Sequence, residues 1–164
     1  MIKKLLASTL ILGVLSTTLV ADGVKVGVGV ALTANDATIR VPLDIASNLR
    51  IEPEVSYGYT SYDDGSSYIM GLGAGVYLMS QPASNVNLYY GAKMGFVVGS
   101  TSYDLPTGGS KSVSDNSFGI APTAGFEYFL DPHVSLGGEV GFRLGFGDVT
   151  NVGLTTATTL RYYF

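Results

Sequence analysis

Along nearly the whole chain, large apolar side chains alternate with small or charged ones, starting at residue 24. A period of two is typical of β-strands whose two faces meet different surroundings. Eight runs have it, and they predict strands over residues 24–32, 38–45, 49–60, 68–79, 86–98, 117–129, 134–146 and 152–164. Pro42, Pro53 and Pro122 fall inside these runs, so we expect a bulge or a strand end at each of them.

The two faces of the predicted strands differ sharply in composition. One face is apolar and aromatic and carries no charge. The other combines glycine, serine, threonine and alanine with every arginine and every glutamate of the chain. It collects eleven ionisable residues, six basic and five acidic: Lys25, Arg40, Asp44, Arg50, Glu52, Glu54, Lys93, Glu127, Glu139, Arg143 and Arg161.

Two kinds of closed barrel fit this alternation. A soluble barrel of the lipocalin type turns its apolar face inward, whereas a membrane barrel turns it outward. The interior of an eight-stranded barrel is only just wide enough for side chains, so the bulky face would overpack it. A register slip that exposed all six basic residues to lipid would cost on the order of 10 kcal/mol. The sequence therefore predicts an all-β fold: a closed, eight-stranded, antiparallel, up-and-down transmembrane β-barrel over residues 22–164.

Residues 1–21 have the features of a cleavable signal peptide. Lys3 and Lys4 form a basic start, residues 5–15 are apolar, and residues 16–21 are mostly small. A retained anchor helix is the alternative. Without this leader the chain is acidic, with 7 basic residues against 13 Asp and Glu, which makes nucleic acid a poor partner.

The connections between the predicted strands alternate in length. Those after the second, fourth and sixth strands are short, while the others include residues 62–67 and the 18-residue stretch 99–116. Membrane barrels have short periplasmic turns and longer outer loops. We therefore expect the longer connections to face outward, with Tyr57, Tyr59, Tyr62, Tyr68 and Tyr103 around the outer membrane interface.

Few residues suggest catalysis or cofactor binding. His133 is the only histidine, and it lies in a predicted short turn at the end opposite the loops, so no Ser-His-Asp arrangement can be built around it. The chain has no cysteine. Asp63 and Asp64 are adjacent acids in a loop, which are more often solvated turn residues than a cation site. We predict no catalytic residue, no metal site and no cofactor.

The chain resembles the small bacterial outer-membrane β-barrels of the OmpA, OmpX and opacity-protein type. The most specific segments are "PTAGFEYFLDPHVSLGGEVGFRLGF" (122–146), which resembles their penultimate hairpin, and the ending "TTLRYYF". The resemblance implies that Leu160, Tyr162 and Phe164 form the C-terminal signal by which the barrel-assembly machinery recognises its clients. It also implies insertion into the outer membrane of a Gram-negative bacterium.

We therefore expect a non-enzymatic outer-membrane protein with a structural or surface-interaction role, surrounded by outer-membrane lipid. Its loops could contact an extracellular ligand. Mutually paired ions would fill the lumen. The alternative is a narrow, porin-like pore that passes small solutes or ions between those charges.

Overall fold

The computed structural model describes residues 23–33, 36–63, 65–104, 109–148 and 150–164. The predicted signal peptide, residues 1–21, and Asp64 lie outside these ranges. Strands occupy most of the described chain: β1 Lys25–Leu32, β2 Ala37–Arg40, β3 Leu43–Ala46, β4 Leu49–Tyr62, β5 Gly65–Ala83, β6 Val86–Asp104, β7 Ser110–Phe129, β8 Val134–Gly147 and β9 Asn151–Tyr163. Within the described ranges, no helix is long and apolar enough to cross a bilayer.

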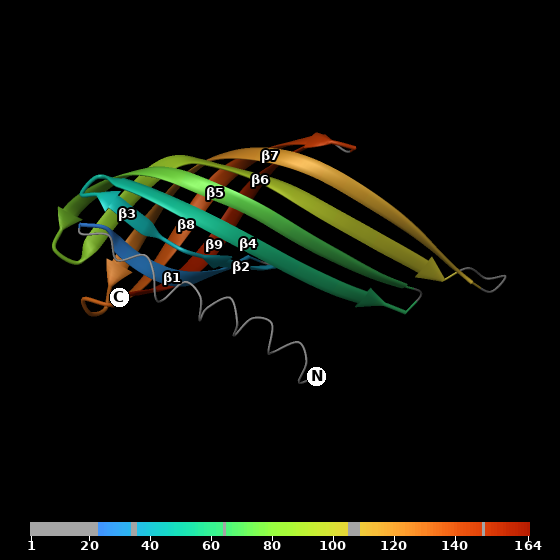
Figure 1. Ribbon diagram of the computed structural model, residues 1–164, viewed down its shortest axis with the longest axis horizontal. Coiled ribbons are helices and arrows are strands. Elements are labelled where there is room, and N and C mark those ends of the chain that lie inside the picture. The colour runs from blue at the N-terminus through green and yellow to red at the C-terminus, as the bar shows by residue number, and fades with distance from the viewer. Residues whose placement is uncertain (1–22, 34–35, 64, 105–108, 149) are drawn as a thin grey trace.

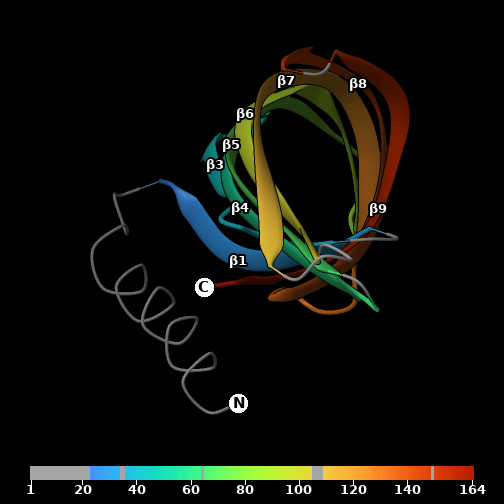
Figure 2. The same ribbon diagram turned by 90° about the vertical axis from the view of Figure 1, so that its right-hand side faces the viewer.

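The strands form a closed antiparallel barrel. Each strand from β4 to β8 pairs with the next one along the chain, and β1 pairs with β9 from Gly27↔Tyr163 to Leu32↔Thr158. Figure 2 shows the resulting ring of strands. Closure leaves no open edge within the ring, so the backbone groups there are paired without help from solvent. The predicted fold class is therefore confirmed.

Nine strand segments occupy eight positions in the barrel because the second predicted strand is divided. Both β2 and β3 lie between β1 and β4, and the break falls at Val41 and Pro42. Pro53 lies in the facing part of β4, and its carbonyl accepts a hydrogen bond from the Val41 N–H at 3.0 Å. Two residues without a backbone N–H thus share one gap in the ladder, which limits the loss of hydrogen bonds to one place.

The third proline also coincides with a gap. Pro122 is paired with Ala92 on the β6 side, but the β7–β8 ladder is interrupted between Ile120↔Leu144 and Thr123↔Gly141. Proline has no N–H to donate to β8, and the strand continues past it because β6 still holds the other side.

The apolar face of every strand lies on the outside of the barrel. Leu72 and Leu154 are 65% and 72% exposed, and the large exposed apolar side chains occur on all the long strands. The residues on the opposite face point into the lumen, where arginine and glutamate side chains are buried. Side-chain volume explains this choice, since the narrow interior admits the glycine-rich face and the wider circumference carries the bulk.

Two hairpins extend well beyond the rest of the barrel at the end away from the C-terminus (Figure 1). The expectation that residues 99–116 form a loop is wrong, because β6 continues to Asp104 and β7 begins at Ser110, in register as far as Asp104↔Ser110. The pairing of β4 with β2 ends at Ala37↔Tyr57, and that of β7 with β8 ends at Ser117↔Gly147. Beyond these pairs, β4 to β7 continue as a four-stranded sheet, called the projecting sheet below, made of residues 58–62, 65–70, 98–104 and 110–116.

The projecting sheet changes the expected position of two tyrosines. Tyr57, Tyr59 and Tyr68 lie on the outer face as predicted. Tyr62 and Tyr103 are paired through Gly65 and share the face of Glu54, which is the lumen face. They therefore do not belong to a ring of aromatic residues facing lipid.

Candidate functional site

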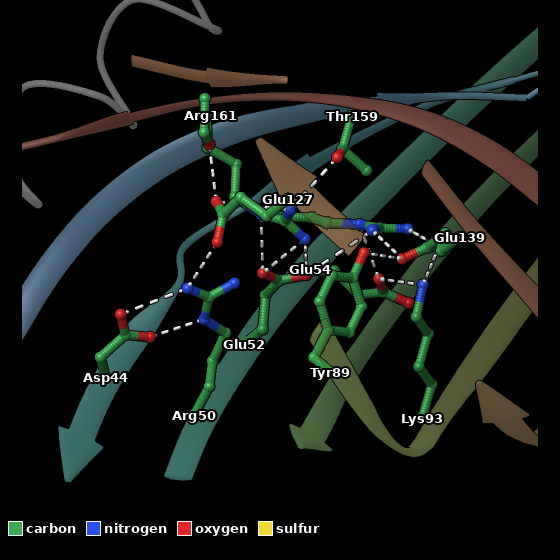
Figure 3. Close-up of polar contacts among 12 residues, drawn as sticks. Asp44, Arg50, Glu52, Glu54, Tyr89, Lys93, Glu127, Glu139, Thr159 and Arg161 are labelled. Atoms are coloured by element: carbon green, nitrogen blue, oxygen red, sulfur yellow. Dashed lines mark hydrogen bonds and ion pairs between the residues drawn. The ribbon is translucent and has the colours of Figure 1, made fainter. Parts of the chain in front are cut away.

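Nine of the eleven ions predicted for the lumen are joined in one network, whose contacts can be followed in Figure 3. They come from seven strand segments: Arg40 from β2, Asp44 from β3, Arg50, Glu52 and Glu54 from β4, Lys93 from β6, Glu127 from β7, Glu139 from β8 and Arg161 from β9. Period-two alternation places each of them inward, and barrel closure brings them within contact distance.

Arg50 is the centre of the half of the network nearest the short turns. Its Nε donates to Asp44 Oδ1 at 2.6 Å, and its Nη2 donates to Glu127 Oε2 at 3.1 Å and to the Tyr163 hydroxyl at 2.7 Å. The same hydroxyl donates to Glu127 Oε1 at 2.6 Å, as does Ser135 Oγ. Glu127 is fully buried, so each of these charge-assisted bonds compensates for lost hydration.

Arg161 links the two halves of the network. Its Nε donates to Glu52 Oε2 at 3.1 Å, its Nη1 donates to Thr159 Oγ1 at 3.1 Å, and Nη1 also lies 3.7 Å from Glu127 Oε1. Arg161 and Glu52 are 2% and 1% exposed. A buried arginine between two buried glutamates is tolerated because each charge has an opposite neighbour.

Arg40 and Lys93 complete the network on the loop side. The Arg40 guanidinium binds Glu139 through two parallel bonds of 2.8 Å, and Lys93 Nζ contacts the same carboxylate. Arg40 Nε lies 3.2 Å from Glu54 Oε2 but without the geometry of a hydrogen bond. Glu139 therefore holds two cations from distant strands, which ties β8 across the lumen to β2 and β6.

Three tyrosines fill the lumen among these ions, and none of them was assigned a role from the sequence. Tyr77, Tyr89 and Tyr163 are at most 2% exposed, and the rings of Tyr77 and Tyr89 meet edge to face at 5.3 Å. Each tyrosine lies two residues from an inward-facing residue of its own strand, namely Gly75, Gly91 and Arg161 respectively. Period-two alternation could therefore have identified all three as lumen residues. Gly125 leaves the space that the Tyr89 ring occupies.

Lys25 and Arg143 lie apart from the network. Among the described residues, neither pairs with a carboxylate, although Arg143 lines the loop-side part of the lumen. Lys25 Nζ instead lies 4.2 Å from the ring centroid of Tyr163 and 4.7 Å from that of Phe129. The eleven predicted ions thus divide into nine that pair and two that do not.

The network separates two cavities. On the loop side is a cavity of about 160 Å³ lined by Arg40, Glu54 and Arg143, among others, and at the short-turn end is one of about 540 Å³ lined by Lys25 and Asp44. The two cavities share no lining residue. Arg50, Glu127, Arg161 and Tyr77 line neither of them and are almost fully buried, so the centre of the lumen is closed by side chains.

His133 lies in the turn between β7 and β8, far from the loop side. Its Nδ1 is 2.9 Å from the Tyr163 carbonyl, and its ring stacks on Tyr162. The Asp131 carboxylate accepts the N–H groups of His133 and Val134 at 2.7 and 2.8 Å, and these bonds lower the pKa of Asp131. The turn is therefore held by local backbone bonds, and the described residues contain no group of three metal-binding side chains.

Comparison with known proteins agrees with this architecture. A model of the OmpA-OmpF-like porin family matches residues 7–142. Among solved structures, Neisserial surface protein A has a TM-score of 0.57 at 18% identity, covering 86% of this chain and 94% of its own.

Two further structures are similar to the same extent. Ail, the attachment invasion locus protein of Yersinia pestis, has a TM-score of 0.57 at 15% identity, covering 86% of this chain and 95% of its own. A major outer membrane protein from Thermus thermophilus has a TM-score of 0.56 at 17% identity, covering 87% of this chain and 100% of its own. No curated protein sequence matches the chain. At these identities, the structural likeness concerns the fold.

Proposed function

The chain belongs to the OmpA-OmpF-like porin family of outer-membrane β-barrels, and on this premise we propose that it is a non-enzymatic surface protein that binds a polypeptide through its projecting sheet. The observation that carries the proposal is the open edge of this sheet along β7. Strand edges with unpaired backbone groups are templates for another strand.

The geometry of β7 defines this edge. The Asn116 N–H donates to Asp148 Oδ2 at 2.9 Å, and the Asn116 carbonyl accepts the Asp148 N–H at 3.2 Å. The backbone groups of Asn116 therefore point away from β6. Because backbone direction alternates along a strand, those of Ser114 and Ser112 point the same way, beyond the end of β8.

Side chains on the projecting sheet suit protein contact. The sheet carries Tyr59, Tyr62, Tyr68 and Tyr103, all about half exposed, and tyrosine contributes large contact area with little loss of conformational entropy. Serine and threonine supply hydrogen bonds between them, such as the 2.9 Å contact of the Ser102 and Ser112 hydroxyls.

Charge restricts the partner. In the sequence, the loop-side segments contain six aspartates against one lysine, Lys111: Asp36, Asp63, Asp64, Asp104, Asp115 and Asp148. Ail, the attachment invasion locus protein, has been crystallised with the heparin analogue sucrose octasulfate. An acidic surface repels such a polyanion, so we propose that this chain takes a neutral or basic polypeptide instead.

A proline substitution on the open edge tests the proposal. Ser114→Pro removes an N–H that points away from β6, so the barrel should fold while strand addition is blocked. Ser114→Ala is the matched control, because it keeps the N–H. Cells that display each form would be compared for attachment to immobilised serum and extracellular-matrix proteins.

We expect wild-type and Ser114→Ala cells to attach equally. Ser114→Pro cells should attach about tenfold less, because one or two main-chain hydrogen bonds to the partner are lost. Equal attachment of all three forms, or attachment of the wild type no better than that of cells without the protein, would overturn the proposal.

The absence of catalysis is part of the proposal. It is supported by the position of His133, whose ring is engaged by the Tyr163 carbonyl at the short-turn end. Among the described lumen carboxylates, those of the network already pair with arginine or lysine. Acids held in this way are poor proton donors or nucleophiles.

The C-terminal strand supports a further partner during insertion. Leu160, Tyr162 and Phe164 lie on the outer face and are 51%, 46% and 62% exposed. We propose that they serve as the recognition signal of the barrel-assembly machinery. Phe164→Ser should lower the yield of inserted protein in cells while leaving refolding into detergent unchanged.

A narrow pore is the second candidate function. Among the described residues, three buried polar atoms of the lumen have no hydrogen-bond partner, namely Arg40 Nε, Arg50 Nη1 and the Tyr77 hydroxyl. Unpaired buried groups are sites where water can enter, and a chain of such waters would connect the two cavities. Single-channel recording in planar bilayers separates the functions: reproducible conductance steps would support the pore, and a silent membrane would support the plugged lumen.

A further inference from the structure

The cavity at the short-turn end of the lumen has the size and lining of a small-molecule site. Its volume is about 540 Å³, within the usual range for ligand pockets. Its wall combines apolar side chains, Met79 and Phe129, with the hydroxyl and amides of Ser47, Asn85 and Asn87. In an outer-membrane barrel this end faces the periplasm.

Lys25 supplies the positive charge among the residues that line the cavity. Lys25 and Asp44 are direct cross-strand partners in the β1–β3 ladder, but Asp44 turns to Arg50, which it contacts at 2.6 Å. The Lys25 ammonium lies over the rings of Phe129 and Tyr163 instead. Lys25 is the one basic residue that lines this cavity, and among the described residues it pairs with no carboxylate.

The surrounding groups select the type of anion. Asp44, which is paired with Arg50, and Asp131 also line the cavity, so a dianion such as phosphate would be repelled more strongly than an ion with a single negative charge. A carboxylate carries one charge, which matches one ammonium. The amide and hydroxyl side chains are suited to a peptide backbone, and Met79 and Phe129 to a small apolar side chain.

We propose that this cavity binds the C-terminal carboxylate of short peptides from the periplasmic side, with Lys25 as the anchoring charge. This is a binding site separate from the projecting sheet, which lies at the other end of the barrel, and from the closed centre of the lumen.

The test compares a peptide acid with its amide on the folded protein in zwitterionic detergent micelles. N-acetyl-alanyl-alanine is the probe, and N-acetyl-alanyl-alanine amide lacks only the charge. Backbone ¹H–¹⁵N chemical shifts of Lys25, Asn85 and Asn87 report binding. Lys25→Met keeps most of the length of the side chain without the ammonium, and Lys111→Met, on the projecting sheet, is the matched control.

We expect the acid to bind saturably with a Kd on the order of 1 mM, and the amide, or the acid with Lys25→Met, to bind at least about tenfold more weakly. Lys111→Met should bind as the wild type does. Equal binding of acid and amide, or unchanged binding by folded Lys25→Met, would overturn the proposal, as would no shift change at about 20 mM acid. If Lys25→Met does not fold, the comparison of acid and amide on the wild-type protein decides alone.

Discussion

At the scale of single residues, the lumen is stabilised by pairing and not by burial of charge as such. Moving an ion out of water costs several kcal/mol, which its partner only about repays. Arg50, Glu52, Glu127 and Arg161 are each at most 2% exposed. Removing one member therefore leaves another buried and unpaired, and this is where substitutions should have their largest effects.

Arg161→Met tests this dependence. It leaves Glu52 with only the more distant Arg40 at 3.6 Å, so we expect the free energy of unfolding to fall by about 3–5 kcal/mol. The double variant Arg161→Met with Glu52→Leu should regain a substantial part of the loss. Urea unfolding in lipid vesicles measures both, and Arg143→Met, outside the network, should cost less than about 1 kcal/mol. Additive losses in the double variant would contradict the pairing.

Two tyrosines allow a second comparison. The Tyr163 hydroxyl accepts from Arg50 and donates to Glu127, so Tyr163→Phe should lower the unfolding free energy by about 2–3 kcal/mol. The Tyr77 hydroxyl is equally buried but has no hydrogen-bond partner in the part of the chain that the structure describes. Tyr77→Phe should therefore be neutral or stabilising by about 1 kcal/mol, since an unpaired hydroxyl is removed. A larger loss of unfolding free energy in Tyr77→Phe than in Tyr163→Phe would refute this assignment of hydrogen bonds.

The sequence was sufficient to assign ions such as Arg40 and Glu139 to the inner face, because facing depends only on the period of two. It did not predict that these two residues, 99 positions apart, form a bidentate pair. Partners depend on strand tilt and stagger, and nothing local in the sequence specifies either. The lack of a carboxylate partner for Lys25 could not be predicted for the same reason.

At the scale of strands, the period-two alternation of the sequence predicted where each strand lies, but it predicted the ends of the strands less well. The eight predicted strands correspond to the observed ones, but β6 and β7 are six or seven residues longer at the loop side. The stretch from residue 99 to 116 is rich in glycine and serine, which are typical of loops. Pairing across the projecting sheet outweighs that weak local preference, as tertiary context commonly does in strands.

Glycine positions test how the strands make room for the lumen side chains. A Cβ on Gly125 would lie 2.5 Å from the Tyr89 hydroxyl and 2.7 Å from the Gly138 carbonyl, whereas one on Gly153 meets nothing within 4 Å. Gly125→Ala should therefore cost about 1–3 kcal/mol through overpacking. Gly153→Ala should be neutral or stabilise by up to about 1 kcal/mol. Urea unfolding of the two variants in vesicles checks the difference, and equal effects would show that Tyr89 is not held against Gly125.

At the scale of the whole molecule, one physical condition accounts for the fold. A closed ring satisfies the backbone in hydrocarbon, and eight strands leave an interior that only small residues and extended ion pairs can fill. The inner face is glycine-rich and charged, and the outer face carries side chains such as Leu72, Phe96 and Leu154. The fold could be predicted because this condition concerns composition on two faces, which the sequence displays directly.

The orientation of the two faces can be measured directly because the chain has no native tryptophan. One variant places a single tryptophan on the outer face, Phe142→Trp, where the native side chain is 47% exposed, and another places it in the lumen, Tyr77→Trp, where it is 1% exposed. Both would be folded into bilayers of lipids with brominated acyl chains, which quench only fluorophores in contact with them. The structure predicts strong quenching at position 142 and little at position 77. Equal quenching at both positions, or stronger quenching at position 77, would contradict a barrel with its apolar face toward lipid and its ions inside.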